Sequence, residues 1–233
     1  MQEEMKELYV NFMGSISAQT IFRLLEITEN APAMHTMHLI ITSLGGSAHW
    51  VNVACRTLPH MPFEVITHAY TPIASAAVVL YCIGKERSAT PSTAFTLHPV
   101  AWPPAYHSYE VALLEENLNY VKNLEKSVTE IIAETVRKRT SDVLNDMQQR
   151  KVLNAEEAKE YGLVTHIVEK PITIYGKHGV SIYGYDQSPS PIGTSPASMT
   201  MTQTRTQPMR RKPIHGLEFA SFGTDLTDSV ADL

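Results

Sequence analysis

The stretch Met37-His-Leu-Ile-Ile-Thr-Ser-Leu-Gly-Gly46 decides the fold of this chain of 233 residues. Its first six residues are mostly apolar, which favours a parallel strand that is buried on both faces. Two glycines close the stretch, and glycine readily takes the positive φ that a sharp turn requires. We therefore expect a buried strand, a turn, and then a helix over residues 48–58.

The same alternation of strand and helix continues on both sides of this stretch. Ser17 is placed to cap a helix that runs to about Glu29. The further expected strands cover residues 8–14, 63–68, 87–89, 94–97 and 165–168, and the further helices cover residues 75–83 and 155–162. This alternation predicts an α/β fold, with a mainly parallel sheet covered by helices.

Residues 108–139 predict one long helix. Apolar side chains recur at helical spacing between Val111 and Val136, and charged residues fill the opposite face. A helix of that length spans about 45 Å, which exceeds the width of a small domain. Two arrangements stay open: a surface helix packed along the core, and a helix that projects toward another subunit.

Composition limits the class of protein. A hydrophobic content of 43% supports a substantial core, and a formal net charge of −5 does not favour a nucleic-acid partner. Cys55 and Cys82 lie in apolar surroundings, which is typical of reduced thiols in a cytoplasmic protein. The longest apolar run, residues 73–83, is too short to cross a membrane. No cofactor motif or metal-ligand spacing occurs, so we expect no cofactor and no metal.

The chain is expected to hold one folded domain over residues 1–170. Residues 171–233 are expected to be a largely disordered C-terminal extension, because residues 187–209 are rich in Ser, Thr and Pro. Residues 172–175 and 181–183 predict a weak hairpin within it.

Ser75 and His98 carry the strongest chemical signal. Ser75 begins the apolar helix of residues 75–83, and His98 ends the apolar strand in Pro91-Ser-Thr-Ala-Phe-Thr-Leu-His98. Each residue has an ordinary explanation, since a serine at that position is most often a helix cap and a histidine at a strand end is most often structural. The pair Gly45-Gly46 likewise has the ordinary explanation of a strand-to-helix turn.

Taken together, these residues supply what acyl transfer requires. Ser75 would attack a carbonyl carbon, and His98 would take the hydroxyl proton and later return it to the leaving amine. The backbone amides of Gly46 and Ala76 would hold the oxyanion.

These stretches resemble the proteolytic subunit of the Clp protease, the ClpP family. The similarity covers about residues 8–168 and lies in four segments: Ser43-Leu-Gly-Gly46, Ile73-Ala-Ser-Ala-Ala77, residues 85–98 and Glu157-Ala-Lys-Glu-Tyr-Gly-Leu-Val164. It implies a ClpP/crotonase-like fold and serine peptidase activity on peptides or unfolded proteins. It also implies a homo-oligomer of stacked heptameric rings joined through the long helix, with an ATP-dependent unfoldase as a partner.

The chain departs from the family at the third catalytic group. Counted back from Leu153, the family aspartate corresponds to Arg150, and a cation there would oppose the imidazolium that forms during acylation. Asp146 lies one helical turn earlier. This chain is a few residues longer than usual for the family between His98 and Leu153, and Asp146 takes the role of the catalytic aspartate if that insertion follows it. Three alternatives stay open: Asp146 completes the triad, Asp142 or another group does so, or His98 has no carboxylate partner. The family's axial loop and helix before the first strand are also missing, which puts unfoldase docking and pore gating in question.

Three functions follow from these patterns. The first is a ClpP-like serine peptidase. The second is a catalytically weak or inactive ring subunit that acts as a scaffold, which Arg150 favours. The third is another crotonase-fold activity, such as an acyl-thioester enzyme, which relies on oxyanion amides and needs no serine–histidine pair.

Overall fold

The computed structural model describes residues 7–31, 34–101, 110–172, 174 and 179–184. The chain divides into two units, Met1–Ser188 and Pro189–Leu233, and every described residue lies in the first unit. The disorder expected for residues 187–209 falls outside the described residues and stays a prediction.

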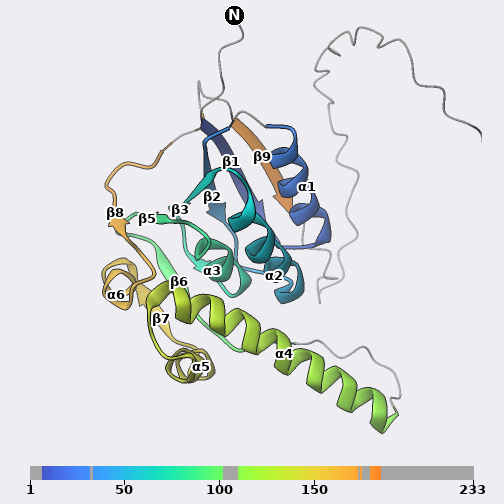
Figure 1. Ribbon diagram of the computed structural model, residues 1–233. Helices are drawn as coiled ribbons and strands as arrows, with labels where there is room; N and C mark the ends of the chain where they lie inside the picture. The colour runs from blue at the N-terminus through green and yellow to red at the C-terminus, as the bar shows by residue number, and fades with distance from the viewer. Residues whose placement is uncertain (1–6, 32–33, 102–109, 173, 175–178, 185–233) are drawn as a thin grey trace, which may run out of the picture. The chain divides into compact units, whose positions relative to one another are not determined.

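A six-stranded sheet forms the centre of the first unit (Figure 1). Its strands run in the order β8-β5-β3-β2-β1-β9, and every neighbouring pair is parallel. The bounds are β1 (Glu7–Gly14), β2 (Thr36–Thr42), β3 (Glu64–Ala69), β5 (Glu86–Ala89), β8 (His166–Ile167) and β9 (Gly179–Gly184). In β2, Leu39 and Ile41 are inaccessible and Ile40, on the other face, is 8% exposed. The expected parallel strand buried on both faces is confirmed.

Three helices and a short 3-10 turn cover one side of this sheet (Figure 1). They are α1 (Ala18–Glu29), α2 (Ala48–Thr57), η1 (Leu58–His60) and α3 (Ala76–Tyr81). Ser17 caps α1 as expected, because its side chain accepts the amide of Thr20 while the Thr20 hydroxyl accepts the amide of Ser17. All six residues of α3 are buried, and its two alanines allow this close packing.

A second, three-stranded sheet lies beside the first. It contains β4 (Ile73–Ala74), β6 (Ala94–Thr96) and β7 (Val152–Asn154), with β4 parallel to β6 and β6 antiparallel to β7. The sequence placed a strand at residues 94–97 but did not separate it from the main sheet. This second sheet positions the candidate site, because it brings the residues after β4 next to those after β6.

The long helix is α4 (Val111–Val136). It is shorter than expected: Arg137 ends it with a left-handed φ of 55°, and a separate helix, α5 (Thr140–Gln148), follows. The first two residues of the predicted helix, 108 and 109, lie outside the described residues. The last described helix, α6 (Ala155–Tyr161), ends at Gly162 as predicted.

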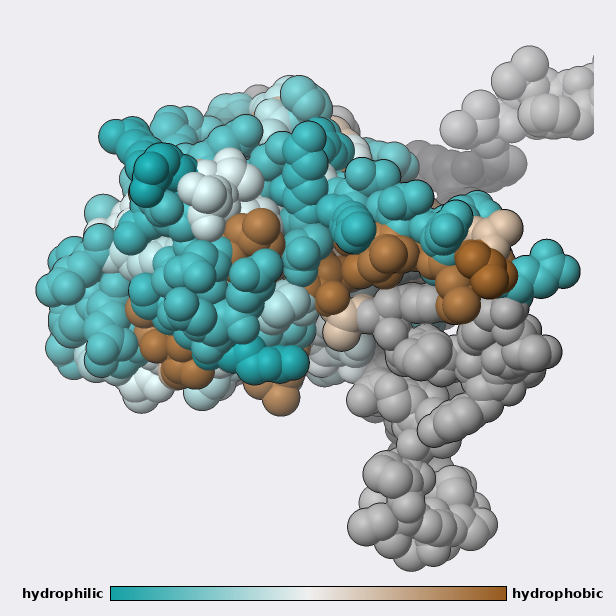
Figure 2. Space-filling view, turned by 90° about the horizontal axis from the view of Figure 1, so that it is seen from below, coloured by the Kyte–Doolittle hydropathy of each residue, from teal (hydrophilic) through white to brown (hydrophobic). Residues whose placement is uncertain are grey.

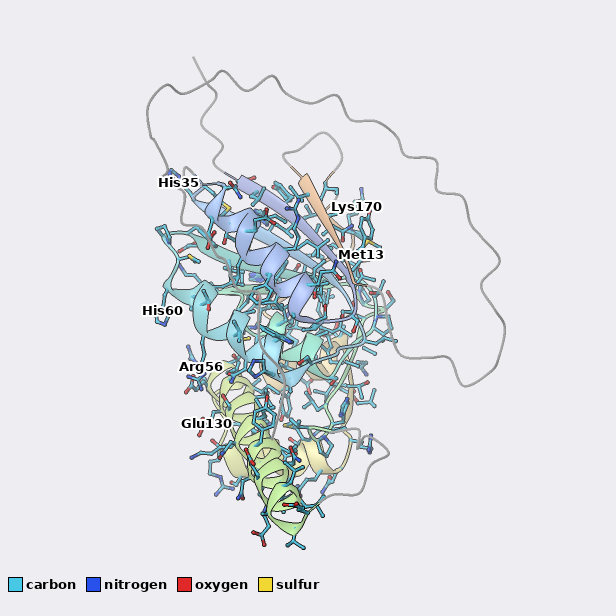
Figure 3. The ribbon with its side chains drawn as sticks, turned by 90° about the vertical axis from the view of Figure 1, so that its right-hand side faces the viewer. Met13, His35, Arg56, His60, Glu130 and Lys170 are labelled. Carbon is cyan, nitrogen blue, oxygen red and sulfur yellow. The ribbon has the colours of Figure 1, made fainter. Side chains whose placement is uncertain are left out.

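The two halves of α4 have different surroundings. In the second half, Val128 and Ile132 are each 2% exposed. Arg56 of α2 lies beside this half (Figure 3), and its guanidinium donates to the Ser127 hydroxyl at 2.8 Å. In the first half, Leu114 is 46% exposed and Leu118 is 52% exposed. Brown, hydrophobic surface accordingly follows the far part of α4 (Figure 2). The helix therefore projects, and the alternative of packing along its whole length is wrong.

The segment after Lys170 carries the last described strand. Residues 173 and 175 of the expected hairpin lie outside the described residues, so the hairpin stays a prediction. Gly179–Gly184 forms β9, which pairs in parallel with β1 from Tyr9 to Gly14. Its residue Ile182 is 3% exposed, so β9 contributes to the core. The sheet therefore continues past residue 170, where the sequence placed the end of the folded domain.

Candidate active site

Ser75 and His98 line the same cavity, which has a volume of about 480 Å³. Ser75 directly follows β4, and its amide donates to the Thr96 carbonyl of β6 at 3.0 Å. His98 follows β6 by two residues. The pairing of β4 with β6 thus explains why two residues far apart in the sequence meet. Their convergence was expected from the sequence, whereas their chemical roles stay a prediction.

Ser75 does not act as a helix cap. Its backbone has φ 58° and ψ −133°, and its side chain makes no capping hydrogen bond to α3. A residue other than glycine held at such a φ costs on the order of 1–3 kcal/mol and persists only where its surroundings impose it. The serine therefore lies at a sharp, strained strand-to-helix turn, which is how hydrolases present a nucleophilic hydroxyl.

The two glycines of the bend have different functions. A Cβ on Gly45, which has φ 108°, would lie 2.6 Å from the Ser75 Cβ. A Cβ on Gly46, which has φ 144°, would lie 2.3 Å from the carbonyl oxygen of Ile16. In the structure, Gly45 makes room for Ser75 and Gly46 makes room for the backbone bridge to Ile16.

The amides of Gly46 and Ala76 are both available for an oxyanion. Each residue lines the cavity beside Ser75. Among the described residues, neither amide donates a hydrogen bond. The Gly46 amide is left over because the backbone bridge to Ile16 uses the Gly45 carbonyl and the Ser47 amide instead. Two backbone donors directed to one point are what stabilises a tetrahedral intermediate.

The imidazole of His98 is held by a backbone carbonyl. Its Nδ1 lies 2.7 Å from the Pro99 carbonyl oxygen, which accepts the Nδ1 proton. In the neutral ring this leaves Nε2 without a proton, which is the form required of a base. Within the part of the chain that the structure describes, no hydrogen bond joins His98 to Ser75.

The structure does not bring Asp146 to His98. Asp146 accepts hydrogen bonds from Lys151 Nζ at 2.9 Å and from the Tyr161 hydroxyl at 2.8 Å. Burial and the bond to this carboxylate raise the pKa of Tyr161. The basic partner of Asp146 is therefore Lys151.

Arg150, which corresponds to the family aspartate, and Asp142, the alternative candidate, both lie at the surface. Arg150 is exposed, with φ 53°, beyond the end of α5, so the prediction that it shares a helical face with Asp146 is wrong. Asp142 accepts two hydrogen bonds from the guanidinium of Arg139, which lower the pKa of its carboxyl. This ion pair is exposed and gives His98 no orienting group.

The walls of the cavity are mainly apolar. Their apolar side chains come from α3, α4, α5 and the residue before His98: Val79, Leu97, Leu124, Val128, Ile132 and Met147. Two polar side chains at the cavity, His49 of α2 and Tyr120 of α4, lie 3.0 Å apart between Nδ1 and the hydroxyl. Sequence reasoning missed both, since neither stands in a motif and only the crossing of α2 and α4 brings them together.

Two further observations concern cofactors and membranes. Within the described ranges, no group of three or more His, Cys, Asp or Glu side chains is placed to hold a metal ion. None of the described helices is long and apolar enough to cross a membrane.

Comparison with known proteins gives consistent similarities. Residues 5–171 match the family model of Clp protease. The ATP-dependent Clp protease proteolytic subunit 2 of Corynebacterium jeikeium is 29% identical over 155 residues, which are 66% of this chain and 73% of that protein. The proteolytic subunit 1 of Thermobifida fusca is 26% identical over 154 residues, 65% of this chain and 68% of that protein.

A solved structure is similar in fold. A variant of ClpP1 from Listeria monocytogenes superposes with a TM-score of 0.60 at 20% identity. The match covers 70% of this chain and 91% of that chain. The expected α/β fold of the ClpP type, with a mainly parallel sheet and a projecting helix, is confirmed.

Proposed function

This chain belongs to the Clp protease family, and from that premise we propose that it is a serine peptidase in which Ser75 and His98 cleave peptide bonds. The observation that carries the proposal is the shared cavity, where a strained serine, a histidine and two free amides come together. A serine that only caps a helix, or a histidine that is only structural, would not require these other groups beside it.

The mechanism follows from the chemistry of these groups. His98 Nε2 removes the hydroxyl proton as Ser75 Oγ bonds to the substrate carbonyl carbon. The Gly46 and Ala76 amides donate to the oxygen that becomes negative. The imidazolium then gives its proton to the leaving amine, and the C–N bond breaks to leave an acyl-enzyme. Water, deprotonated by the same imidazole, hydrolyses the ester and restores Ser75.

The substrate is proposed to be an extended peptide of an unfolded protein. The mainly apolar walls of the 480 Å³ cavity favour a large apolar side chain next to the cleaved bond. A second hollow of about 770 Å³ is lined by Leu44, Thr71 and the two glycines of the bend, among others. Gly46 lines the first cavity as well, so both hollows meet the bend. We propose that the peptide passes along the bend between the two hollows.

The assembly is proposed to be a homo-oligomer of stacked heptameric rings that enclose the sites. The support is the exposed apolar first half of α4, which needs a partner surface. The relatives are named ATP-dependent, and an ATP-dependent unfoldase is the corresponding partner for this chain. We propose the cytoplasm as its compartment, since Cys55 and Cys82 are both free and buried.

A second candidate is a ring subunit with little or no activity. The binding of Asp146 by Lys151 and Tyr161 favours it, because a histidine without its carboxylate is a weaker catalyst. A fluorophosphonate probe separates the two candidates. A peptidase reacts at Ser75 and loses both labelling and peptide turnover in Ser75→Ala, whereas a scaffold stays unlabelled and alters only the activity of the ring it joins.

A further inference from the structure

Asp146 is held by two side chains from outside its own helix. Lys151 precedes β7 and Tyr161 ends α6, and together they occupy both oxygens of the carboxylate. The Asp146 side chain is 15% exposed and that of Lys151 is 38% exposed. The carboxylate is thus partly desolvated, and removing one partner leaves a charge that must find another.

The chain that follows Asp146 is connected to the catalytic cavity. Met147, the residue after Asp146, lines the cavity together with His98. The carbonyl of Lys151 accepts the amide of Leu97 at 2.9 Å, and Leu97 directly precedes His98. The segment that follows the helix of Asp146 and the segment that precedes His98 are therefore joined by a hydrogen bond, although the two side chains have other partners.

We propose that Lys151 and Tyr161 form a latch that withholds Asp146 from His98, and that opening the latch raises the peptidase activity. This inference rests on the proposed function of Ser75 and His98. Lys151 and Tyr161 do not line the cavity, so they are positioning residues that act through Asp146.

Lys151 has a contact that survives opening. Its ammonium lies 5.3 Å from the centre of the Tyr161 ring, and that of Lys138 lies 4.1 Å from the same centre. A cation over an aromatic ring is stabilised without a carboxylate. The latch residues therefore keep each other as partners when Asp146 turns away.

The charges around His98 determine the direction of the effect. In the latched form its Nδ1 faces the neutral carbonyl of Pro99, and the other titratable side chains at the cavity, among the described residues, are His49 and Tyr120. Glu125 of α4 is engaged by the Val100 amide. An Asp146 carboxylate in place of the Pro99 carbonyl would stabilise the imidazolium that forms during acylation.

The groups around Asp146 are Lys151, Tyr161 and, across the Tyr161 ring, Lys138. The neighbouring charges Asp142 and Arg139 pair with each other at the surface. The latch thus contains one carboxylate, that of Asp146, with the ammonium groups of Lys151 and Lys138 nearby. Only the ammonium of Lys151 contacts the carboxylate directly.

Lys151→Met tests the latch, with Lys138→Met as the matched control. The control removes the other ammonium over the Tyr161 ring but no hydrogen bond to Asp146. We expect kcat/KM for a peptide to rise about fivefold in Lys151→Met, the scale of one partly exposed ion pair. Lys138→Met should leave kcat/KM unchanged, and Asp146→Asn should cancel the gain of Lys151→Met.

A second readout does not depend on turnover. In protein labelled with ¹⁵N at histidine, the NMR resonance of the His98 Nδ1 proton should move in Lys151→Met, because its acceptor changes from the Pro99 carbonyl to a carboxylate, and should not move in the double variant with Asp146→Asn. An unmoved resonance in folded Lys151→Met overturns the latch. If that variant does not fold, Tyr161→Phe takes its place with the same expected directions. A moved resonance in a protein that cleaves no peptide would refute the proposed function and leave the latch standing.

Discussion

Gly45→Ala gives the sharpest prediction of the geometry around Ser75. The added Cβ would lie 2.6 Å from the Ser75 Cβ and 3.1 Å from its Oγ, where ordinary contacts begin at 3.4 Å. The serine must therefore move by about 0.8 Å, and a displacement of about 1 Å at a reacting atom costs on the order of 100-fold in rate. Alanine at φ 108° adds about 1–3 kcal/mol of backbone strain. We expect kcat/KM to fall about 100-fold and the free energy of unfolding to fall by about that strain.

The assay combines peptide turnover, the rate of fluorophosphonate labelling and thermal denaturation. Gly162→Ala is the matched control, because Gly162 has a similar φ of 98° and its Cβ would meet only Val136, at 3.2 Å. This control should lose a similar amount of stability, yet its labelling rate per folded molecule should stay at the level of the unmodified protein. A Gly45→Ala protein that labels and cleaves at the full rate would refute the placement of Gly45 against the nucleophile.

Three further predictions concern separate parts of the molecule. Ser75→Gly should abolish turnover while raising the free energy of unfolding by about 1 kcal/mol, because glycine relieves the strain at φ 58°. Thermal denaturation measures the gain in stability, and Ser75→Ala, which should gain none, is the control. Leu118→Glu should shift the protein toward smaller assemblies in sedimentation velocity, because Leu118 lies in the apolar half of α4, whereas Phe22→Glu, at an exposed position of α1, should not. Burial raises the pKa of Cys82 to about 12 and also raises the pKa of Cys55, so both thiols stay protonated at pH 8. Iodoacetamide should therefore alkylate them only after unfolding, which mass spectrometry would record. Rapid alkylation of the folded protein would contradict their burial.

Much of the fold follows from local patterns in the sequence. Ser17 marks the start of α1 and Gly162 marks the end of α6, because a cap and a left-handed residue act within one turn of helix. The end of α4 lacked such a signal, since Arg137 adopts a left-handed conformation that arginine rarely takes. The predicted helix over residues 108–139 therefore continued three residues past the end of α4, up to the residue before α5 begins.

The site shows the same division between local and distant information. Ser75, His98 and the glycine bend could be predicted because strand ends and turn residues are local features. The partners of Asp146 could not, because Tyr161 reaches it from α6 through tertiary packing, and Lys151 reaches it only because the turn after α5 folds back. The strain at Ser75 was also hidden, since a serine at the start of a helix has the pattern of an ordinary cap.

The pairing of β9 with β1 has a consequence for synthesis on the ribosome. β1 lies next to the edge of the sheet and is completed only by the last described strand of the chain. Translation at about 5–20 residues per second leaves β1 without its outer neighbour for on the order of ten seconds or more after it emerges. During that interval its unpaired amides and carbonyls can template association with another nascent chain. A chaperone that shields the first strand until Gly179–Gly184 is translated would therefore raise the yield of native protein.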